Sequence, residues 1–184
     1  INEKRGRKTT KTDRINEILD ASTRIINQRG IGEINLQSIA SQLGLKYTTL
    51  YHYFRGRDAL GRETYLRHHA AREENITRQL DKSGTGQHRL LEFIRQELSS
   101  VPGSRVRGDY TGTLSQKERQ TVLDARDGVL DHLSELVLAG QADGSIRPMD
   151  AKTAAIAILC ILDRFIMLNG IAKQIGVKKN AIID

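Results

Sequence analysis

Apolar residues between positions 12 and 30 recur three or four residues apart, with polar residues between them. This spacing places them on one face of an α-helix, whose start we expect Thr12 or Asp13 to cap and which we expect to end at Gly30. The apolar positions are Ile15, Ile18, Leu19, Ile25 and Ile26. Residues 1–11 show no such period, and we expect them to form a flexible basic arm.

Two short helices joined by a tight turn are expected next. Asn35 is a typical N-cap for the first of them, and Gly44 suits a left-handed turn at its end. Their inner faces would be formed by Leu36, Ile39, Ala40 and Leu43, then by Leu45, Leu50 and either Tyr53 or Phe54. A small alanine followed four residues later by a turn glycine is typical of a helix-turn-helix.

The rest of the chain predicts long helices separated by glycine-containing breaks. Helices are expected near residues 58–80, 87–99, 115–140 and from 150 onward, with breaks at 83–86, 102–113 and 144–148. Residues 154–166 are apolar on several faces, and such a helix must be buried on several faces, in the core of one subunit or against a partner subunit. No segment alternates as a strand does, so the predicted fold class is all-α.

Composition excludes several other classes of protein. The single cysteine, Cys160, cannot form an intrachain disulfide, and its apolar neighbours predict a buried, inert thiol. The longest apolar run, residues 154–162, is too short to cross a bilayer, and the first residues lack the apolar stretch of a signal peptide. We therefore expect a cytoplasmic protein with no membrane partner.

The sequence lacks the common signatures of catalysis. The sequence contains no nucleophile elbow, P-loop or dinucleotide fingerprint. His69 and Glu73 have the spacing of half a helical metal site, but no third ligand follows at a readable spacing. We expect His68 and His69 to lie on a solvated helix face. The sequence therefore predicts no enzyme, no metal and no cofactor.

The positive charge is concentrated near the N-terminus. The chain has a formal net charge of +7, and its first 60 residues hold 11 basic and 6 acidic side chains, a net +5. Such an excess is expected on a surface that binds nucleic acid, although a solvated tail would show the same run of charge.

Five separated elements between residues 12 and 62 agree in order and spacing with one known type of DNA-binding domain. They are residues 14–21, Ile25-Ile26 with Gly30, Ile39-Ala40 with Gly44, residues 50–54 and residues 57–60. Over this segment the chain resembles the tetracycline-repressor (TetR) family. It departs from the family at Ile26, Ile34 and Arg57, where Phe, a small polar residue and Lys are common.

The resemblance implies a three-part organisation. Residues 1–11 would be the basic arm, residues 12–56 a three-helix helix-turn-helix DNA-binding domain, and residues 57–184 a larger helical effector-binding and dimerisation domain. It also implies three partners, namely double-stranded DNA with a near-palindromic operator, a second copy of the chain, and an unknown small-molecule effector.

The second short helix carries side chains suited to DNA. Thr48 and Thr49 can hydrogen-bond base edges. In proteins that this sequence resembles, the positions of Lys46, Tyr47, Thr48, Tyr51, His52 and Arg57 commonly touch DNA. Gln37 and Ser38, at the start of the preceding helix, can donate to a phosphate. The basic side chains of the arm (Arg5, Arg7, Lys8 and Lys11) could lie in an adjacent minor groove. Tyr53 is expected to be a packing residue.

The dimer interface and the effector site, both expected in residues 57–184, are predicted less precisely than the DNA contacts. The resemblance implies that the last two long helices form a four-helix bundle in the dimer, with candidate contacts Ala151, Ala154, Ala155, Ile158, Leu162 and Phe165. Candidate effector-binding residues are polar or bulky groups that interrupt apolar faces, namely Tyr65, His69, Phe93, Tyr110, Arg126, Phe165 and Met167. An apolar pocket with a few polar groups would suit a lipophilic or aromatic effector.

Three functions follow from these observations. The first is a homodimeric repressor that a small-molecule effector releases from its operator. The second is a DNA-binding protein without a small effector, whose C-terminal half serves only dimerisation or a protein partner. The third is an enzyme. A closed cavity with polar groups would favour the first function, and a filled core would favour the second.

Overall fold

The computed structural model describes residues 10–99, Val106 and residues 111–174, with side chains described as far as Phe165. All regular secondary structure in these residues is helical, as predicted. The α-helices are α1 (Lys11–Arg29), α2 (Leu36–Gln42), α3 (Tyr47–Tyr53), α4 (Arg57–Leu80), α5 (Gly86–Ser99), α6 (Gln116–Ala142) and α7 (Ala151–Gln174), and two 3₁₀ turns are η1 (Ile31–Glu33) and η2 (Thr111–Thr113).

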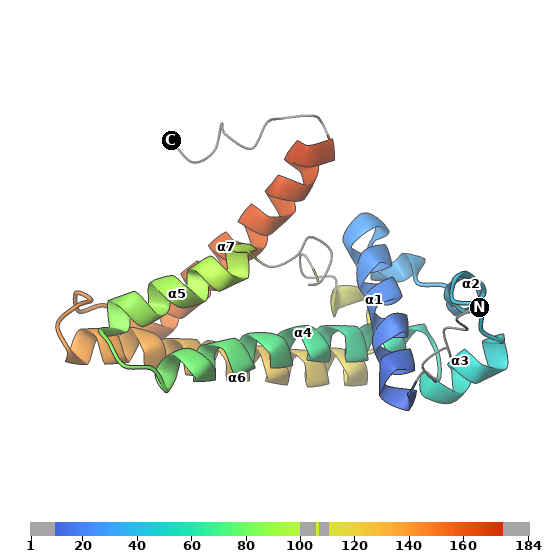
Figure 1. Ribbon diagram of the computed structural model, residues 1–184, viewed down its shortest axis with the longest axis horizontal. Helices are drawn as coiled ribbons and strands as arrows, with labels where there is room; N and C mark the ends of the chain where they lie inside the picture. The colour runs from blue at the N-terminus through green and yellow to red at the C-terminus, as the bar shows by residue number, and fades with distance from the viewer. Residues whose placement is uncertain (1–9, 100–105, 107–110, 175–184) are drawn as a thin grey trace, which may run out of the picture.

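The helices form two groups that share α4 (Figure 1). The first three gather at one end of the molecule, whereas α4 and α6 run side by side along its long axis and α5 and α7 lie over the other end. Within the described part of the chain, none of the helices combines the length and apolar character that crossing a membrane requires.

Local signals set the end of α1, the start of α2 and the turn before α3 where the sequence predicts them. Gly30 ends α1 with a φ of 88°, which suits a residue without a Cβ atom. Asn35 caps α2, because its Oδ1 accepts a hydrogen bond from the Ser38 N–H at 3.1 Å. Gly44 occupies the turn between α2 and α3 with a φ of 64°. The predicted helix-turn-helix is therefore confirmed.

The predicted N-cap of α1 is wrong by two or three residues. Thr10 is the N-cap, rather than Thr12 or Asp13. The Thr10 hydroxyl accepts from the Asp13 N–H at 3.1 Å, and the Asp13 carboxylate accepts from the Thr10 N–H at 3.0 Å. This reciprocal capping box places Lys11 in the first helical turn instead of in the arm.

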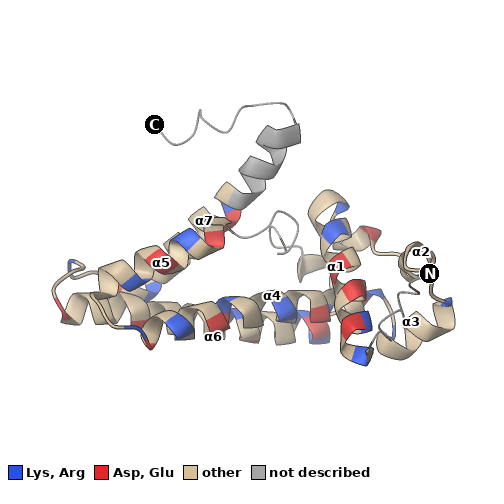
Figure 2. Ribbon diagram, in the orientation of Figure 1, with Lys and Arg blue, Asp and Glu red and all other residues tan. Residues whose placement is uncertain are grey.

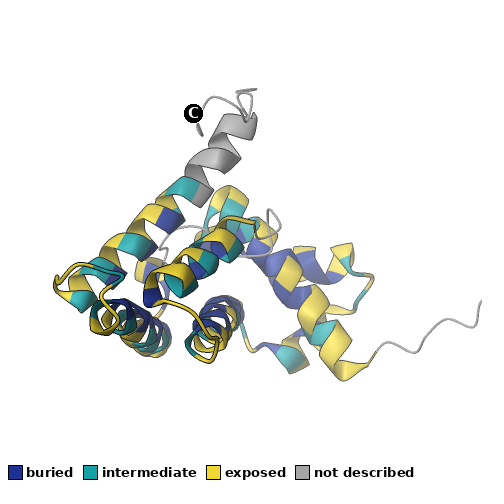
Figure 3. Cartoon of the chain, turned by 60° about the vertical axis from the view of Figure 1, so that its left-hand side comes forward, coloured by how far each residue is buried: buried dark blue, intermediate teal, exposed yellow. Residues whose placement is uncertain are grey.

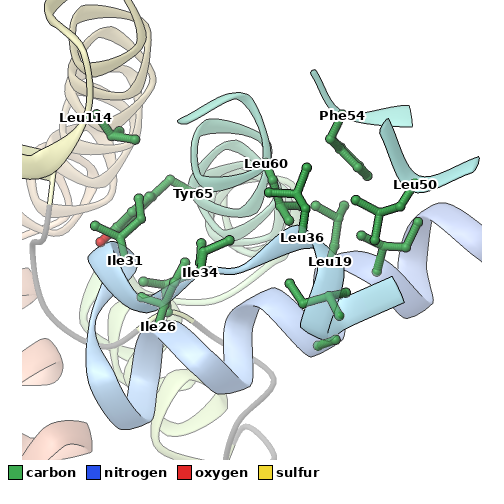
Figure 4. Packing of buried hydrophobic residues seen from close by; sticks show 14 of the residues in the cluster. Leu19, Ile26, Ile31, Ile34, Leu36, Leu50, Phe54, Leu60, Tyr65 and Leu114 are labelled. Carbon is green, nitrogen blue, oxygen red and sulfur yellow. The ribbon is translucent and has the colours of Figure 1, made fainter. Parts of the chain in front are cut away.

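One hydrophobic core joins the N-terminal helices to the second half of the chain. It contains the fully buried Ile18, Ile26, Ile39 and Leu50 of α1 to α3. It also includes Tyr65 of α4 and Leu114, which lie against Ile31 (Figure 4). Helices α1, α2 and α3 are thus packed directly on α4 and on the segment before α6.

A second core fills the far end of the molecule, between α4, α5, α6 and α7. It is built from residues of all four helices, namely Ile76, Phe93, Val129, Leu130, Leu133, Leu136, Ala155, Leu159 and Leu162. The start of α5 approaches α6 so closely that a Cβ atom on Gly86 would lie 2.2 Å from the backbone nitrogen of Gly140. Glycine at position 86 permits this contact.

Candidate nucleic-acid interface and ligand cavity

The outer face of α3 displays two large aromatic side chains. Tyr47 is 46% exposed and Tyr51 is 44% exposed, and their ring centroids lie 5.9 Å apart. Thr48 and His52 are exposed on the same short helix, while Thr49 is half-buried. Leu50 is fully buried and anchors the helix in the core. The result is a polar, aromatic face on a helix held rigidly by its other side.

Positive charge flanks α3 but does not lie on it. The helix contains no Lys, Arg, Asp or Glu and is uniformly tan in Figure 2. Lys46 precedes it, and Arg55 and Arg57 follow it, all with exposed side chains. Arg57 Nε donates to Asp58 at 3.0 Å, and the other oxygen of Asp58 accepts from a backbone N–H at the start of α6. Asp58 is therefore fixed, and an exposed ion pair such as this one can be exchanged for a phosphate at small cost.

The start of α2 lies beside this face. Gln37 and Ser38 are both exposed there. The backbone N–H of Ser38 already donates to Asn35, so a phosphate contact from Ser38 would use its hydroxyl group. Three of the predicted arm residues, Arg5, Arg7 and Lys8, lie outside the described residues. Tyr53 is half-buried and packs against the first core, as predicted.

Polar contacts tie α4 to α1. The Thr64 hydroxyl donates to the Ser22 hydroxyl at 2.9 Å, and both side chains are buried. One turn further along, Arg67 forms an ion pair with Asp20 at 2.9 Å and donates to the Thr23 hydroxyl at 3.1 Å. A displacement of α4 along or about its axis would therefore strain these contacts with the DNA-binding half.

A cavity of about 340 Å³ lies between α4, α6 and α7, which is within the usual size range of small-molecule sites. Half of its lining is apolar, contributed by Val106, Val122, Leu123, Leu130, Ile156, Leu159 and Cys160. The other half is polar or charged, contributed by Tyr65, His68, His69, Arg72, Thr111, Arg126 and Asp163. The cavity lies between the two cores, since Tyr65 belongs to the first and Leu159 to the second.

A buried ion network forms part of the cavity wall. The Arg72 side chain is 3% exposed and donates from Nε to Glu97 at 2.9 Å and from Nη2 to Asp163 at 2.5 Å. Glu97 is fully buried and also accepts from Asn75 at 3.3 Å. Burial lowers the pKa of Arg72, but the carboxylates of Asp163 and Glu97 more than offset this effect, so the net pKa is raised. The guanidinium is therefore charged, and it links α4, α5 and α7.

Three of the seven predicted effector-binding residues line this cavity, namely Tyr65, His69 and Arg126. That they bind an effector stays a prediction. Phe93 is fully buried in the second core and is not part of the lining, because its face of α5 turns toward α4, α6 and α7. Phe165 is half-buried and also not part of the lining. Tyr110 and the side chain of Met167 lie outside the described residues.

Two charged residues of the wall, Arg72 and Asp163, were not among the predicted site residues. A signal for Arg72 exists, because Tyr65, His68, His69 and Arg72 fall at i, i+3, i+4 and i+7 and are all buried on one face of α4. The predicted solvated face for His68 and His69 is therefore wrong. Glu73, considered above with His69 as half of a metal site, forms an ion pair with His132 at 3.1 Å. No set of three potential metal-binding side chains occurs among the described residues.

The faces of α7 differ in part from the prediction. Ala155 and Leu162 were candidates for the dimer interface, but both are buried in the second core of the subunit itself. Ala151, Ala154, Ile158 and Phe165 are half-buried. The large apolar side chains exposed on the part of α7 described as far as Phe165 are Ile156 and Ile161, and Ile161 is 67% exposed. Figure 3 colours the chain by burial and shows exposed positions along this helix. Cys160 is also exposed and lines the cavity, so the predicted buried thiol is wrong.

Comparison with known proteins agrees with this architecture. Residues 18–64 match the sequence model of the family described as "Bacterial regulatory proteins, tetR family". The HTH-type transcriptional repressor NemR of Escherichia coli is 29% identical over 119 residues, which are 64% of this chain and 58% of NemR. The HTH-type transcriptional regulator TtgR of Pseudomonas putida is 24% identical over 164 residues, which are 82% of this chain and 77% of TtgR. The chain thus spans less than two thirds of the length of NemR.

Solved structures show the same fold over most of the chain. The reduced form of E. coli NemR matches with a TM-score of 0.68 and 22% identity, covering 86% of this chain and 88% of NemR. FadR from Bacillus subtilis in complex with stearoyl-CoA matches with a TM-score of 0.70 and 20% identity, again covering 86% and 88%. Residues 18–64 thus match the tetR family of bacterial regulatory proteins, and the chain as a whole shares the fold of the solved NemR and FadR structures.

Proposed function

We propose that the chain is a homodimeric transcriptional repressor that binds a near-palindromic DNA operator and is released from it by a small-molecule effector. The α3 face would enter the major groove, and the cavity between α4, α6 and α7 would bind the effector. This assigns the molecule a regulatory role and no catalytic one.

The observation that carries the DNA-binding role is the chemistry of the α3 face. Its exposed Tyr47, Thr48 and Tyr51 offer hydroxyl groups and ring edges to bases and phosphates. Lys46 and Arg57 lie at its two ends, where the strands of a duplex would pass. An uncharged helix between flanking cations suits base readout at the centre and phosphate contacts at the edges.

Dimerisation is supported by α7. Ala157 and Ile161, one turn apart on the same face of this helix, are exposed in the single subunit, and exposed apolar surface on a soluble protein commonly marks an interface. Two-fold symmetry would present two α3 helices to DNA half-sites about 34 Å apart. Ile161→Asp is expected to yield a monomer in size-exclusion chromatography, whereas Leu91→Asp, at a leucine of α5 that is 47% exposed, is expected to leave the dimer intact. A dimeric Ile161→Asp protein would contradict this interface.

Effector binding is supported by the cavity with its polar wall, which favours the first hypothesis over a C-terminal half that serves only dimerisation. Two solved proteins of the same fold were determined in complex with small molecules. FadR is solved with stearoyl-CoA, and AibR, with a TM-score of 0.66, is solved with isovaleryl coenzyme A and operator DNA. The route to the DNA would be α4, because it lines the cavity through Tyr65 and contacts α1 through Thr64 and Arg67. An effector that favours another position of α4 would shift the population of dimers away from the DNA-binding arrangement.

Selection of bound fragments from genomic DNA at physiological salt, followed by sequencing, tests the DNA-binding role. The expected result is a recurring near-palindrome whose half-sites lie about one helical turn apart. Binding without sequence preference would leave the fold unaffected but would contradict a specific regulator. An α3 variant, Tyr47→Ala with Thr48→Ala, provides the control, because it should lose the selected motif while retaining its folded circular dichroism spectrum.

A further inference from the structure

The cavity wall carries an unusual arrangement of charge. Two guanidinium groups, of Arg72 and Arg126, line it, and Asp163 provides the one carboxylate among the described lining residues. Asp163 is already held by Arg72 at 2.5 Å. Arg126 pairs with Asp127 at 3.1 Å, and Arg72 pairs with Glu97 behind the wall as well as with Asp163. The buried cation that reaches the cavity together with an exchangeable partner is therefore Arg72.

The two carboxylates that pair with Arg72 differ in how easily another anion can displace them. Glu97 is fully buried and is held a second time by Asn75, so it cannot be hydrated in place of the ion pair. Asp163 is 40% exposed on α7, at the cavity, and can turn toward water. An incoming anion would therefore compete with Asp163 rather than with Glu97.

We propose that the ligand of this cavity is an amphipathic anion, a carboxylate, sulfonate or phosphate on an apolar body, whose anionic group takes the place of the Asp163 carboxylate on Arg72. This inference rests on the proposed effector role of the cavity and names the chemical class of the effector. The apolar body lies against Leu130, Val122 and Leu159, and the second guanidinium, of Arg126, faces the same space.

A cationic ligand would meet the opposite situation. It would have to draw Asp163 away from Arg72, with which this carboxylate already pairs at 2.5 Å. Pairing with Asp163 would also remove one of the two counter-charges of a buried arginine, and an uncompensated buried charge is strongly unfavourable. An anion avoids both effects, because it replaces one carboxylate on Arg72 by another.

The exchange has a structural consequence. The ion pair between Arg72 and Asp163 connects α4 to α7. Once a ligand anion occupies the guanidinium, this connection between α4 and the helix with the exposed apolar face is lost. The ligand thereby loosens α4 from α7 at a point two turns from the Thr64 and Arg67 contacts with α1.

The test compares two fluorescent probes with the same apolar body. Anilinonaphthalenesulfonate carries a sulfonate, and N-phenylnaphthylamine lacks it. The measured quantity is the ratio of their dissociation constants in the full-length protein and in each variant. Arg72→Gln should reduce the preference for the sulfonate about tenfold, since one charge-assisted hydrogen-bonding group is lost. Asp163→Asn should raise it several-fold, because the competing carboxylate is gone.

Controls separate this role from a structural one. Arg78→Gln removes an exposed arginine of the same helix and should leave the ratio unchanged. If Arg72→Gln does not fold, the double variant Arg72→Gln with Glu97→Gln removes both buried charges and should show the same loss of sulfonate preference. If the Arg72–Asp163 pair only stabilises the fold, Asp163→Asn should bind the sulfonate probe no more tightly than the unaltered protein does. That result would overturn the proposal.

The probe-binding test does not depend on whether the protein binds DNA. If the ratio does not respond in folded variants while fragment selection yields an operator, the anionic ligand class is wrong and the proposed regulator stands. If the ratio responds as expected but no operator is found, the cavity has been assigned correctly and the proposed regulatory function fails.

Discussion

Glu97 offers the sharpest test of how the second half of the molecule is held together. Its carboxylate is fully buried, accepts from Arg72 at 2.9 Å, and accepts from Asn75 at 3.3 Å. Glu97→Gln preserves the shape of the side chain, so it creates no cavity and removes only the charge. The guanidinium of Arg72 then remains buried with a single counter-charge, on Asp163.

The magnitude follows from this geometry. Removing one partner of a buried ion pair costs about 3–5 kcal/mol of unfolding free energy. Because Asp163 still compensates part of the charge, we expect the lower end, about 3 kcal/mol. Against a typical stability of about 5–15 kcal/mol this is a large loss. Urea unfolding followed by circular dichroism, at one protein concentration for all variants, measures it.

Two further variants decide whether burial is the cause. Glu74 pairs with Arg78 at 3.0 Å on the exposed surface of α4, and Glu74→Gln should cost no more than about 0.5 kcal/mol. Replacing Arg72 by Met and Glu97 by Leu together removes both buried charges and should be less destabilising than Glu97→Gln alone. The reasoning is refuted if Glu97→Gln lies within about 1 kcal/mol of the exposed control, because buried and exposed pairs would then behave alike.

Three other predictions concern DNA, packing and pH. Thr48→Ala should weaken binding to the selected operator by about 1–3 kcal/mol and relax its sequence preference, and an equal loss on unrelated DNA in fluorescence anisotropy would rule out base contact. Gly86→Ala should destabilise the protein by about 3 kcal/mol, because its Cβ would meet the backbone of Gly140 at 2.2 Å; Gly128→Ala in α6, where nothing lies within 4 Å, should be neutral or slightly stabilising in the same urea titration. The pKa of Asp143 is lowered below its ordinary value of 3.8 by hydrogen bonds from Ser145 and the Gly86 N–H, so its stabilisation is present above that pH and is lost as the pH falls through the lowered pKa. Asp143→Asn should therefore lower the melting temperature at neutral pH, and a difference that persists unchanged at strongly acidic pH would contradict the assignment.

Local chemistry made the DNA-binding half predictable from sequence. Asn35 and Gly44 act within four residues of their own positions, as a side-chain cap and a left-handed turn. The start of α1 was misplaced because the cap, Thr10, lies within a stretch whose basic character suggested an arm. A helix end is decided by one hydrogen-bond pair, and here Thr10 and Asp13 form it.

Which faces of α7 are buried could not be predicted from sequence in the same way. A helix that is apolar on nearly every side carries no periodic signal that separates one face from another. Ala155 and Leu162 turned out to be buried within the subunit, whereas Ile156 and Ile161 are exposed. The choice depends on where α5 and α6 lie, and their positions follow from contacts between residues distant in sequence, such as the Gly86–Gly140 approach.

The polar wall of the cavity shows why a functional site can be hidden in an ordinary amphipathic pattern. His68, His69 and Arg72 resemble the polar side of a surface helix, because sequence alone does not reveal that helices distant in the chain bury them. Two features nevertheless mark the stripe as special. It continues with Asn75 and Gln79 at the same spacing, and the whole stripe is buried. Polar groups are buried in such number only where hydrogen bonds or ion pairs compensate for lost hydration. Helix α4 therefore has a polar inner face as well as a charged outer one, and the inner face requires partners such as Glu97 and Asp163 on other helices. A polar stripe that needs distant partners is the property we would seek in related sequences to locate their ligand cavities.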